Sequence, residues 1–249
     1  IIQLSIQEGN IEKNCAHIEE LVRKHSSDDI DLLCFPELCI SGYNFEKAII
    51  SDREALFFSE LASKYKIAIM AGINKKEGNQ HYDVACIWDE TGTLLGEYKK
   101  IHLWDKENDF FAKGEELVTV SFKGWTIGLL ICADFGFSEL AKSLALKKNA
   151  DVIMYPSAWN PGWDYLFSGC SSIRAAENQV YTVGLNRASG DVEYCGNTTV
   201  SNPDGTTLAR LCTSEESYTR VVLKKECLEK AKETIPWRLM RREEVYNKI

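Results

Sequence analysis

The chain has 249 residues, of which 45% are hydrophobic, and it carries 29 Lys and Arg residues against 37 Asp and Glu residues. A chain of this length and composition can bury about 70–75% of its unfolded surface, so a mainly disordered protein is excluded. The formal charge of −8 and the scattered lysines offer no basic surface for a polyanion, so we expect no nucleic-acid partner. No apolar run approaches the roughly 18 residues that span a bilayer, and the first ten residues do not read as a signal peptide. We therefore expect a cytoplasmic protein without a membrane partner.

The cysteines predict neither a disulfide framework nor a zinc site. There are nine of them, an odd number, and no two have C-x-x-C spacing. None of the four histidines lies within metal-ligand spacing of two cysteines. Cys15, Cys34 and Cys86 lie in apolar helix or strand patterns and are interpreted as small packed hydrophobes. Cys132 is the exception because of its position.

Helices and strands alternate along the chain in an order that occurs twice. The predicted elements are helices over residues 10–25, 51–65, 138–148 and 163–178 and strands over residues 31–35, 67–73, 151–155 and 180–185. A hairpin follows each set, joining 82–88 to 93–98 and 197–201 to 206–211 through turns that contain Gly.

This repetition predicts two sheets that pack face to face, with helices on the outer faces. The expected fold class is α/β, a four-layer αββα sandwich. A single doubly wound sheet is the competing arrangement, but it needs crossovers that are longer than the connections of the late hairpins. No linker or change of composition divides the chain, so residues 1–249 are expected to form one domain.

Three reactive side chains stand where predicted strands end. Glu37 follows an apolar strand and Pro36, Lys100 ends the strand after the first hairpin turn, and Cys132 lies between an apolar strand and a helix. Burial is expected to raise the pKa of Glu37, and the helix dipole to lower the pKa of Cys132. A thiolate nucleophile, a carboxylate base and an ammonium that stabilises an oxyanion suffice for acyl transfer through a thioester. Each residue taken singly has a structural alternative: an exposed loop residue for Glu37, a solvated strand-end residue for Lys100, and a buried core residue for Cys132.

The segments around these residues resemble the nitrilase, or carbon–nitrogen hydrolase, superfamily. They are FPELCISGY with Glu37, YKKIHLW with Lys100 and GLLICADFGFSE with Cys132, and the resemblance extends over nearly the whole chain. It implies the αββα fold, Glu37 as general base, Lys100 as oxyanion stabiliser and Cys132 as nucleophile. It also implies that the backbone N–H of Ala133 completes the oxyanion hole.

Some family members carry a fourth catalytic residue, a Glu on the loop after the Lys. The resemblance assigns Glu107 in HLWDKENDFFAKG to this role, with Asp105 and Asp109 as nearby competitors. Arg174 and Glu177 are interpreted as a salt bridge on the helix and not as substrate ligands.

The predicted substrate pocket departs from the commoner family pattern. Ala133 is small where many members have a large residue, and Ser138 stands where Pro is usual. Tyr43, Phe111 and Trp159 are candidates for aromatic walls of the acyl site, although large aromatic residues near strand ends more often serve packing.

The resemblance implies an amidase that hydrolyses a small carboxamide without a metal or organic cofactor. Hydrolysis of N-carbamoyl compounds or nitriles by the same residues remains an alternative, as does a catalytically silent scaffold or metabolite-binding protein. A homodimer or higher homo-oligomer is also expected. The tail of residues 234–249 has apolar side chains at Trp237, Leu239 and Met240 that need a partner surface.

Overall fold

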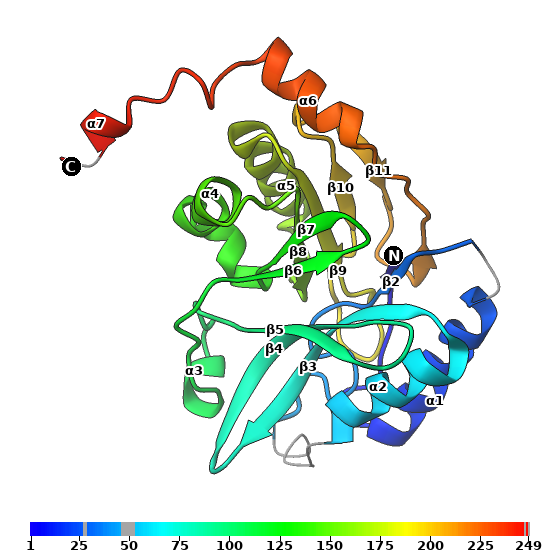
Figure 1. Cartoon of the computed structure of the whole chain (residues 1–249). Coiled ribbons are helices and arrows are strands. Elements are labelled where there is room, and N and C mark those ends of the chain that lie inside the picture. The colour runs from blue at the N-terminus through cyan, green and yellow to red at the C-terminus, as the bar shows by residue number, and fades with distance from the viewer. Residues whose placement is uncertain (27–28, 46–52, 247, 249) are drawn as a thin grey trace.

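The computed structural model of the chain describes residues 1–26, 29–45, 53–246 and 248, and it confirms the predicted layered α/β fold (Figure 1). Two larger sheets face each other, with α1 and α2 outside one sheet and α4 and α5 outside the other. A third, two-stranded sheet was not predicted. It joins β1 (Ile2–Gln3) to β12 (Ser217–Tyr218), two segments that lie far apart in the sequence.

The first large sheet has the strand order β2-β3-β4-β5. Its strands and outer helices are α1 (Ile11–His25), β2 (Leu32–Cys34), α2 (Arg53–Tyr65), β3 (Ala68–Glu77), β4 (Gln80–Trp88) and β5 (Leu94–Lys99). β2 and β3 are parallel, whereas β3, β4 and β5 form antiparallel hairpins. The predicted start of α2 at residues 51 and 52 lies outside the described residues.

The second large sheet has the strand order β11-β10-β9-β8-β7-β6. Its elements are β6 (Val118–Phe122), β7 (Trp125–Leu129), a 3₁₀ helix (Cys132–Gly136), α4 (Ser138–Lys147), β8 (Val152–Ser157), α5 (Asp164–Asn178), β9 (Tyr181–Asn186), β10 (Thr199–Ser201) and β11 (Thr207–Arg210). β8 and β9 are parallel and β9, β10 and β11 antiparallel, which repeats the pairing of β2 to β5. The predicted internal repetition is therefore confirmed.

The apolar pattern explains why the sheets stack in this way. Alternate side chains of β3 point to opposite faces. Ile69 and Ile73 join the core beneath α1 and α2, while Ala68 and Met70 join the core between the two sheets. Both faces of this strand are buried over residues 68–73, and this part of its sequence is an unbroken apolar run.

The first helix shows how local sequence sets its boundaries. Asn10 accepts a hydrogen bond from the backbone N–H of Lys13 at 3.3 Å and so caps the helix that starts at residue 11. Ile18 and Val22 lie on the buried face and are fully buried. The prediction that began the helix at residue 10 included the cap.

The chain ends with α6 (Lys225–Thr234) and α7 (Glu243–Tyr246), and α7 lies apart from the sandwich (Figure 1). α3 (Glu107–Phe110) is a single helical turn that follows the last strand of the first large sheet and precedes the first strand of the second along the chain. In the described part of the chain, no helix is both long and apolar enough to cross a bilayer.

Candidate active site

Glu37 is held inside the molecule by the loop that leaves β2. The loop packs directly on β3, where the backbone N–H of Gly72 donates to the carbonyl of Pro36 at 3.1 Å. A side chain at residue 72 could not fit there, because its Cβ would lie 2.5 Å from the Cα of Glu37. The side chain of Glu37 is fully buried as a result.

Lys100 follows β5 and lies at the centre of a cluster of carboxyl groups. Its backbone N–H donates to the carbonyl of Asp83 at 2.9 Å, which fixes the start of the loop. Its Nζ lies 2.6 Å from Glu37 Oε1, 2.8 Å from Glu107 Oε1 and 3.2 Å from Asp83 Oδ2. Burial by itself lowers the pKa of Lys100, but attraction to Glu37 and Asp83 outweighs this effect and holds the pKa well above its usual range. Lys100 is therefore a cation in this site.

Glu107 is the acid of its loop that reaches the cluster. It begins α3 and is buried, whereas its neighbours Asp105 and Asp109 are exposed. Its Oε2 accepts a hydrogen bond from the backbone N–H of Trp104 at 2.8 Å, and its Oε1 accepts one from the hydroxyl of Tyr43 at 3.0 Å. Of the three acids considered from the sequence, the structure brings only this one to Lys100.

Cys132 stands at the first position of the 3₁₀ helix with a φ of 44°. This left-handed backbone conformation is uncommon for a residue other than Gly and bends the chain sharply after β7. The charges of Glu37 and Lys100 act on the thiol, and the backbone of Ala158 hydrogen-bonds to it. The structure therefore brings the cysteine, the lysine and the two predicted glutamates to one place.

Two expectations about proton affinity are wrong. The pKa of Cys132 is raised well above its usual range, because burial and the negative charge of Glu37 outweigh the attraction of Lys100. The helix dipole does not compensate, since residue 132 begins a five-residue 3₁₀ helix and not α4. The pKa of Glu37 is lowered and not raised: burial raises it, but Lys100 and hydrogen bonds from neighbouring side chains more than offset burial.

Asp134 holds the cysteine turn against the lysine loop. It is fully buried and accepts hydrogen bonds from the backbone N–H of Ile131 at 3.0 Å and from the hydroxyl of Tyr98 at 2.7 Å. On the lysine loop, the backbone N–H of His102 lies at 3.2 Å and its ring Nδ1 at 2.8 Å from the same carboxylate. One side chain thus fixes the relative position of the two loops.

The predicted salt bridge between Arg174 and Glu177 is confirmed, with the two side chains 3.0 Å apart on α5. Arg174 also donates two hydrogen bonds to the carbonyl of Phe135, at 3.1 Å and 3.0 Å. The pair therefore supports the turn that carries Cys132.

Asp83 is the member of the cluster that was not predicted from the sequence. It lies on β4, where the side chains of Ala85 and Ile87 point to the same face and belong to the core between the sheets. An acid that alternates in step with two core residues on one strand could have been recognised as a buried carboxyl group. The apolar residues around it led to the segment being interpreted only as a core strand.

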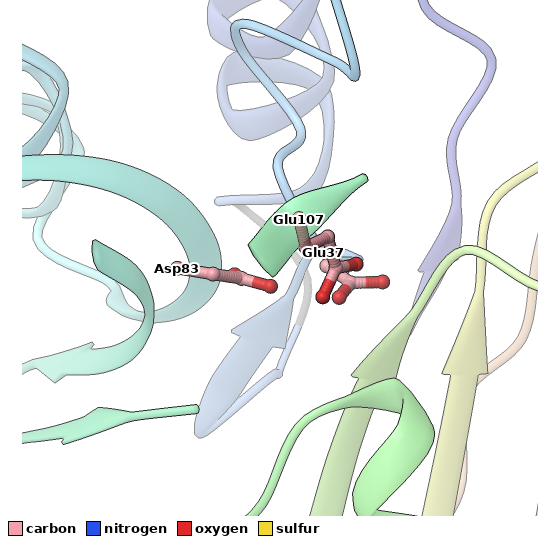
Figure 2. A group of neighbouring side chains, drawn as sticks. All are labelled: Glu37, Asp83 and Glu107. Atoms are coloured by element: carbon pink, nitrogen blue, oxygen red, sulfur yellow. The ribbon is translucent and has the colours of Figure 1, made fainter. Parts of the chain in front are cut away.

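Three carboxyl groups converge in the site, as Figure 2 shows for Glu37, Asp83 and Glu107. One oxygen from each lies within 4.8 Å of the others, a spacing that could also hold a metal ion. The ammonium of Lys100 contacts all three groups, so it already supplies a positive charge at that position. Burial, together with repulsion from Glu37, raises the pKa of Asp83 and of Glu107.

The residues predicted to bind substrate have different surroundings. Tyr43 is half-buried beside Glu107, and Ala133 directly follows the cysteine. Phe111 is buried and packs on Phe110, with ring centres 4.9 Å apart. Trp159 packs against other aromatic rings, and its ring N–H is buried without a hydrogen-bond partner among the described residues.

Comparison with known proteins identifies the family. Residues 1–230 match the model of the carbon–nitrogen hydrolase family. A nitrilase of Pyrococcus abyssi is 32% identical over 227 residues, which cover 86% of this chain and 85% of that protein. Human omega-amidase NIT2 is 29% identical over 273 residues, covering 99% and 95% of the two chains.

Solved structures have the same fold. Saccharomyces cerevisiae Nit3, a nitrilase superfamily member, aligns with a TM-score of 0.84 at 25% identity, covering 95% of this chain and 93% of that one. An amidase from Nesterenkonia sp. AN1 aligns with a TM-score of 0.87 at 24% identity, covering 99% and 97%. The nitrilase-type sandwich expected from the sequence is confirmed. The chain belongs to the carbon–nitrogen hydrolase family and is a hydrolase of carbon–nitrogen bonds other than peptide bonds.

Proposed function

We propose that the protein hydrolyses a small carboxamide through a thioester on Cys132, with Glu37 as general base and Lys100 as oxyanion stabiliser. The observation that carries this proposal is the buried contact of Lys100 Nζ with Glu37 at 2.6 Å, in a cluster whose charges act on the Cys132 thiol. Two relatives, the yeast and human omega-amidases NIT3 and NIT2, are named for amide substrates, which supports an amide. The Pyrococcus abyssi relative named nitrilase makes a nitrile the second candidate.

The first step forms the thioester bond. In the resting site the thiol is neutral and Glu37 is ionised, because the pKa of Cys132 is raised and that of Glu37 is lowered. As Sγ attacks the amide carbon, its proton passes to the Glu37 carboxylate, and the carbonyl oxygen becomes an oxyanion. Lys100 Nζ and the backbone N–H of Ala133 donate hydrogen bonds to this oxyanion.

The second half releases both products. Glu37 returns the proton to the departing nitrogen, the carbon–nitrogen bond breaks, and ammonia leaves a thioester behind. A water molecule then gives a proton to Glu37 and attacks the thioester carbon. The carbon–sulfur bond breaks, the sulfur regains its proton from Glu37, and the carboxylic acid departs. The sum is amide plus water giving acid plus ammonia, and no external reductant or oxidant is needed.

Glu107 orients Lys100 in this scheme. Its carboxylate is fixed by Tyr43 and by the backbone of Trp104 at the same time as it contacts the ammonium. The lysine is thereby kept at one position while the oxyanion develops. Tyr43, Ala133 and Trp159 are proposed to surround the acyl group, and Phe111 to support that surface by packing.

The test is ammonia release from a panel of neutral carboxamides, N-carbamoyl compounds and nitriles, compared between the wild type and Cys132→Ala. We expect release from carboxamides and, after rapid quenching, an acyl group on Cys132 by mass spectrometry. Preference for carbamoyl compounds or nitriles would reassign the substrate within the family. No release from any class, together with no alkylation of Cys132 by iodoacetamide at neutral pH, would favour a silent scaffold.

We further propose that the protein works as a homodimer or higher homo-oligomer through its C-terminal tail. Leu239, Met240 and Trp237 are 84%, 66% and 49% exposed, and such apolar side chains on one segment are typical of an interface. We expect light scattering at micromolar concentration to give at least twice the mass of the chain. A monomeric mass for the full chain would contradict the proposal.

A further inference from the structure

The cluster around Lys100 contains more acidic groups than one cation can neutralise. Glu37 and Asp83 are 0% exposed, Lys100 is 1% exposed and Glu107 is 2% exposed. If all three carboxyl groups were ionised, these buried side chains would carry a net charge of −2 away from bulk solvent. Isolating like charges in this way is strongly unfavourable, so the site must hold at least one additional proton.

The hydrogen bonds indicate where that proton resides. Glu107 accepts from Lys100, from the Tyr43 hydroxyl and from the Trp104 backbone. Burial and Glu37 raise its pKa too, but these three donors stabilise its anion better than that of Asp83, which has no such donors among the described residues. Asp83 is the farthest of the three from Lys100 Nζ, at 3.2 Å.

Neither oxygen of Asp83, nor Oε2 of Glu37, accepts a hydrogen bond of good geometry from any described residue. One proton placed between these two carboxyl groups would give both of them a partner. The same proton would remove one of the two excess negative charges.

We propose that Asp83 is a positioning residue that stays protonated and donates a hydrogen bond from its carboxyl group to the Glu37 carboxylate. This role rests on the proposed function of Glu37 as the general base. Asp83 keeps that base ionised and correctly oriented next to a neutral thiol, without touching the substrate.

The electrostatic environment supports this assignment. The groups that act on Asp83 are Glu37 on the loop after β2, Lys100 after β5 and Glu107 on α3. Burial and the repulsion of Glu37 raise the pKa of Asp83 well above its ordinary value, and Lys100 only partly opposes them. The hydrogen bond from Asp83 in turn helps to lower the pKa of Glu37.

The first experiment compares two substitutions of Asp83 in the full chain. Asn retains a donor toward Glu37 and cannot ionise, so Asp83→Asn should lose only a few-fold in kcat, as for one imperfectly replaced hydrogen bond. Leu has no donor, so Asp83→Leu should lose about tenfold or more. Since the lost hydrogen bond favours ionised Glu37, the acid limb of the pH–rate profile in Asp83→Leu should move to higher pH by about one unit.

Asp31→Asn serves as the matched control, because Asp31 is exposed and pairs with Lys123 on the surface. Its turnover and pH profile should equal those of the wild type. Equal losses in Asp83→Asn and Asp83→Leu, or an acid limb that stays in place in Asp83→Leu, would overturn the proposal. A merely structural role of Asp83 would lower kcat or stability without moving the acid limb.

A second experiment does not depend on turnover. The infrared spectrum of Asp83→Asn at neutral pH is subtracted from that of the wild type in the carboxyl stretching region. We expect the difference to show the carbonyl stretch of a protonated carboxylic acid. A difference that contains the bands of an ionised carboxylate would overturn the proposal. If no amide is hydrolysed by the wild type, the proposed function fails, while this spectrum still reports the proton on Asp83.

Discussion

Lys100 and Arg187 are both buried cations, but they are surrounded in different ways. Arg187 is 1% exposed and faces a single carboxylate, that of Glu8, at 2.5 Å. It also contacts Tyr194, whose hydroxyl accepts a hydrogen bond at 3.0 Å and whose ring lies under the guanidinium. Lys100 instead contacts three carboxyl groups.

The difference separates a structural ion pair from the site that we propose to exchange protons. At Arg187 one positive charge meets one negative charge, so neither partner gains by changing its protonation state. Around Lys100 the charges do not balance, so protons must be shared among the carboxyl groups. A site of this kind can accept and return a proton with small rearrangement, which is what a general base requires.

The two regions are also connected. The second oxygen of Glu8 accepts a hydrogen bond from the backbone N–H of Tyr43 at 2.5 Å, and the hydroxyl of Tyr43 reaches Glu107. The Arg187–Glu8 pair therefore holds the loop that carries Tyr43, and Tyr43 in turn contacts the cluster around Lys100. Substitutions around Lys100 should mainly lower turnover, whereas substitutions around Arg187 should mainly lower stability.

The largest effect is expected for Cys132→Ala. Without the nucleophile, turnover should fall by about 10⁴-fold or more, while the free energy of unfolding changes little. Ammonia release and urea unfolding measure the two quantities. Cys212→Ala, at an exposed position, is the control and should retain full activity. Alkylation of several wild-type cysteines at the same rate as Cys132 would count against its special role.

Glu107→Gln should lower turnover by about 10²-fold, the scale for removing one positioned catalytic group. Cys132 should keep much of its reactivity toward iodoacetamide in this variant, whereas Glu37→Gln should lose both turnover and thiol reactivity. Asp109→Asn changes an exposed acid on the same helix and should match the wild type. Near-normal turnover in Glu107→Gln would show that Lys100 needs no support from α3.

Glu54 provides a third kind of buried carboxyl group, because none of the described residues forms an ion pair with it. Burial raises its pKa to about 8, partly opposed by the hydrogen bond that the backbone N–H of Asn74 donates to Oε2 at 2.9 Å. The folded state therefore prefers the protonated acid, and this contribution to stability is lost as the pH rises from the unfolded pKa of 4.5 through about 8.

Glu54→Gln should consequently raise the free energy of unfolding by about 4 kcal/mol at pH 8 and leave it nearly unchanged at pH 4. Urea unfolding at the two pH values measures this. Glu60→Gln, at an exposed position on the same helix, is the control and should show no such pH dependence. An equal effect of Glu54→Gln at both pH values would mean that the carboxyl group does not titrate in this range.

The smallest effect is expected for Glu8→Gln. The amide can still accept a hydrogen bond but no longer neutralises Arg187, so the free energy of unfolding should fall by about 1–2 kcal/mol. Turnover should change by less than about tenfold, because the chemical groups stay in place. Glu19→Gln removes an exposed pair with Lys64 and should have no measurable effect. A loss of turnover without a loss of stability would place Glu8 in the catalytic cluster.

The αββα layering could be predicted because apolar periodicity and turn residues are local properties of the sequence. The strand ending at Pro36 and the repeated helix–strand order were sufficient to place Glu37, Lys100 and Cys132 at strand ends. Glu107 was separated from Asp105 and Asp109 by resemblance, and the structure adds that it alone of the three is buried.

Only the tertiary structure decided which charged groups lie next to each other. Asp83 lies on β4 far from Glu37 in sequence, so nothing local indicates that the two carboxyl groups meet over Lys100. The directions predicted from the sequence for the pKa shifts of Glu37 and Cys132 were wrong for the same reason. A pKa depends on the sum of burial and of every nearby charge, and that sum exists only after segments distant in the chain have packed together.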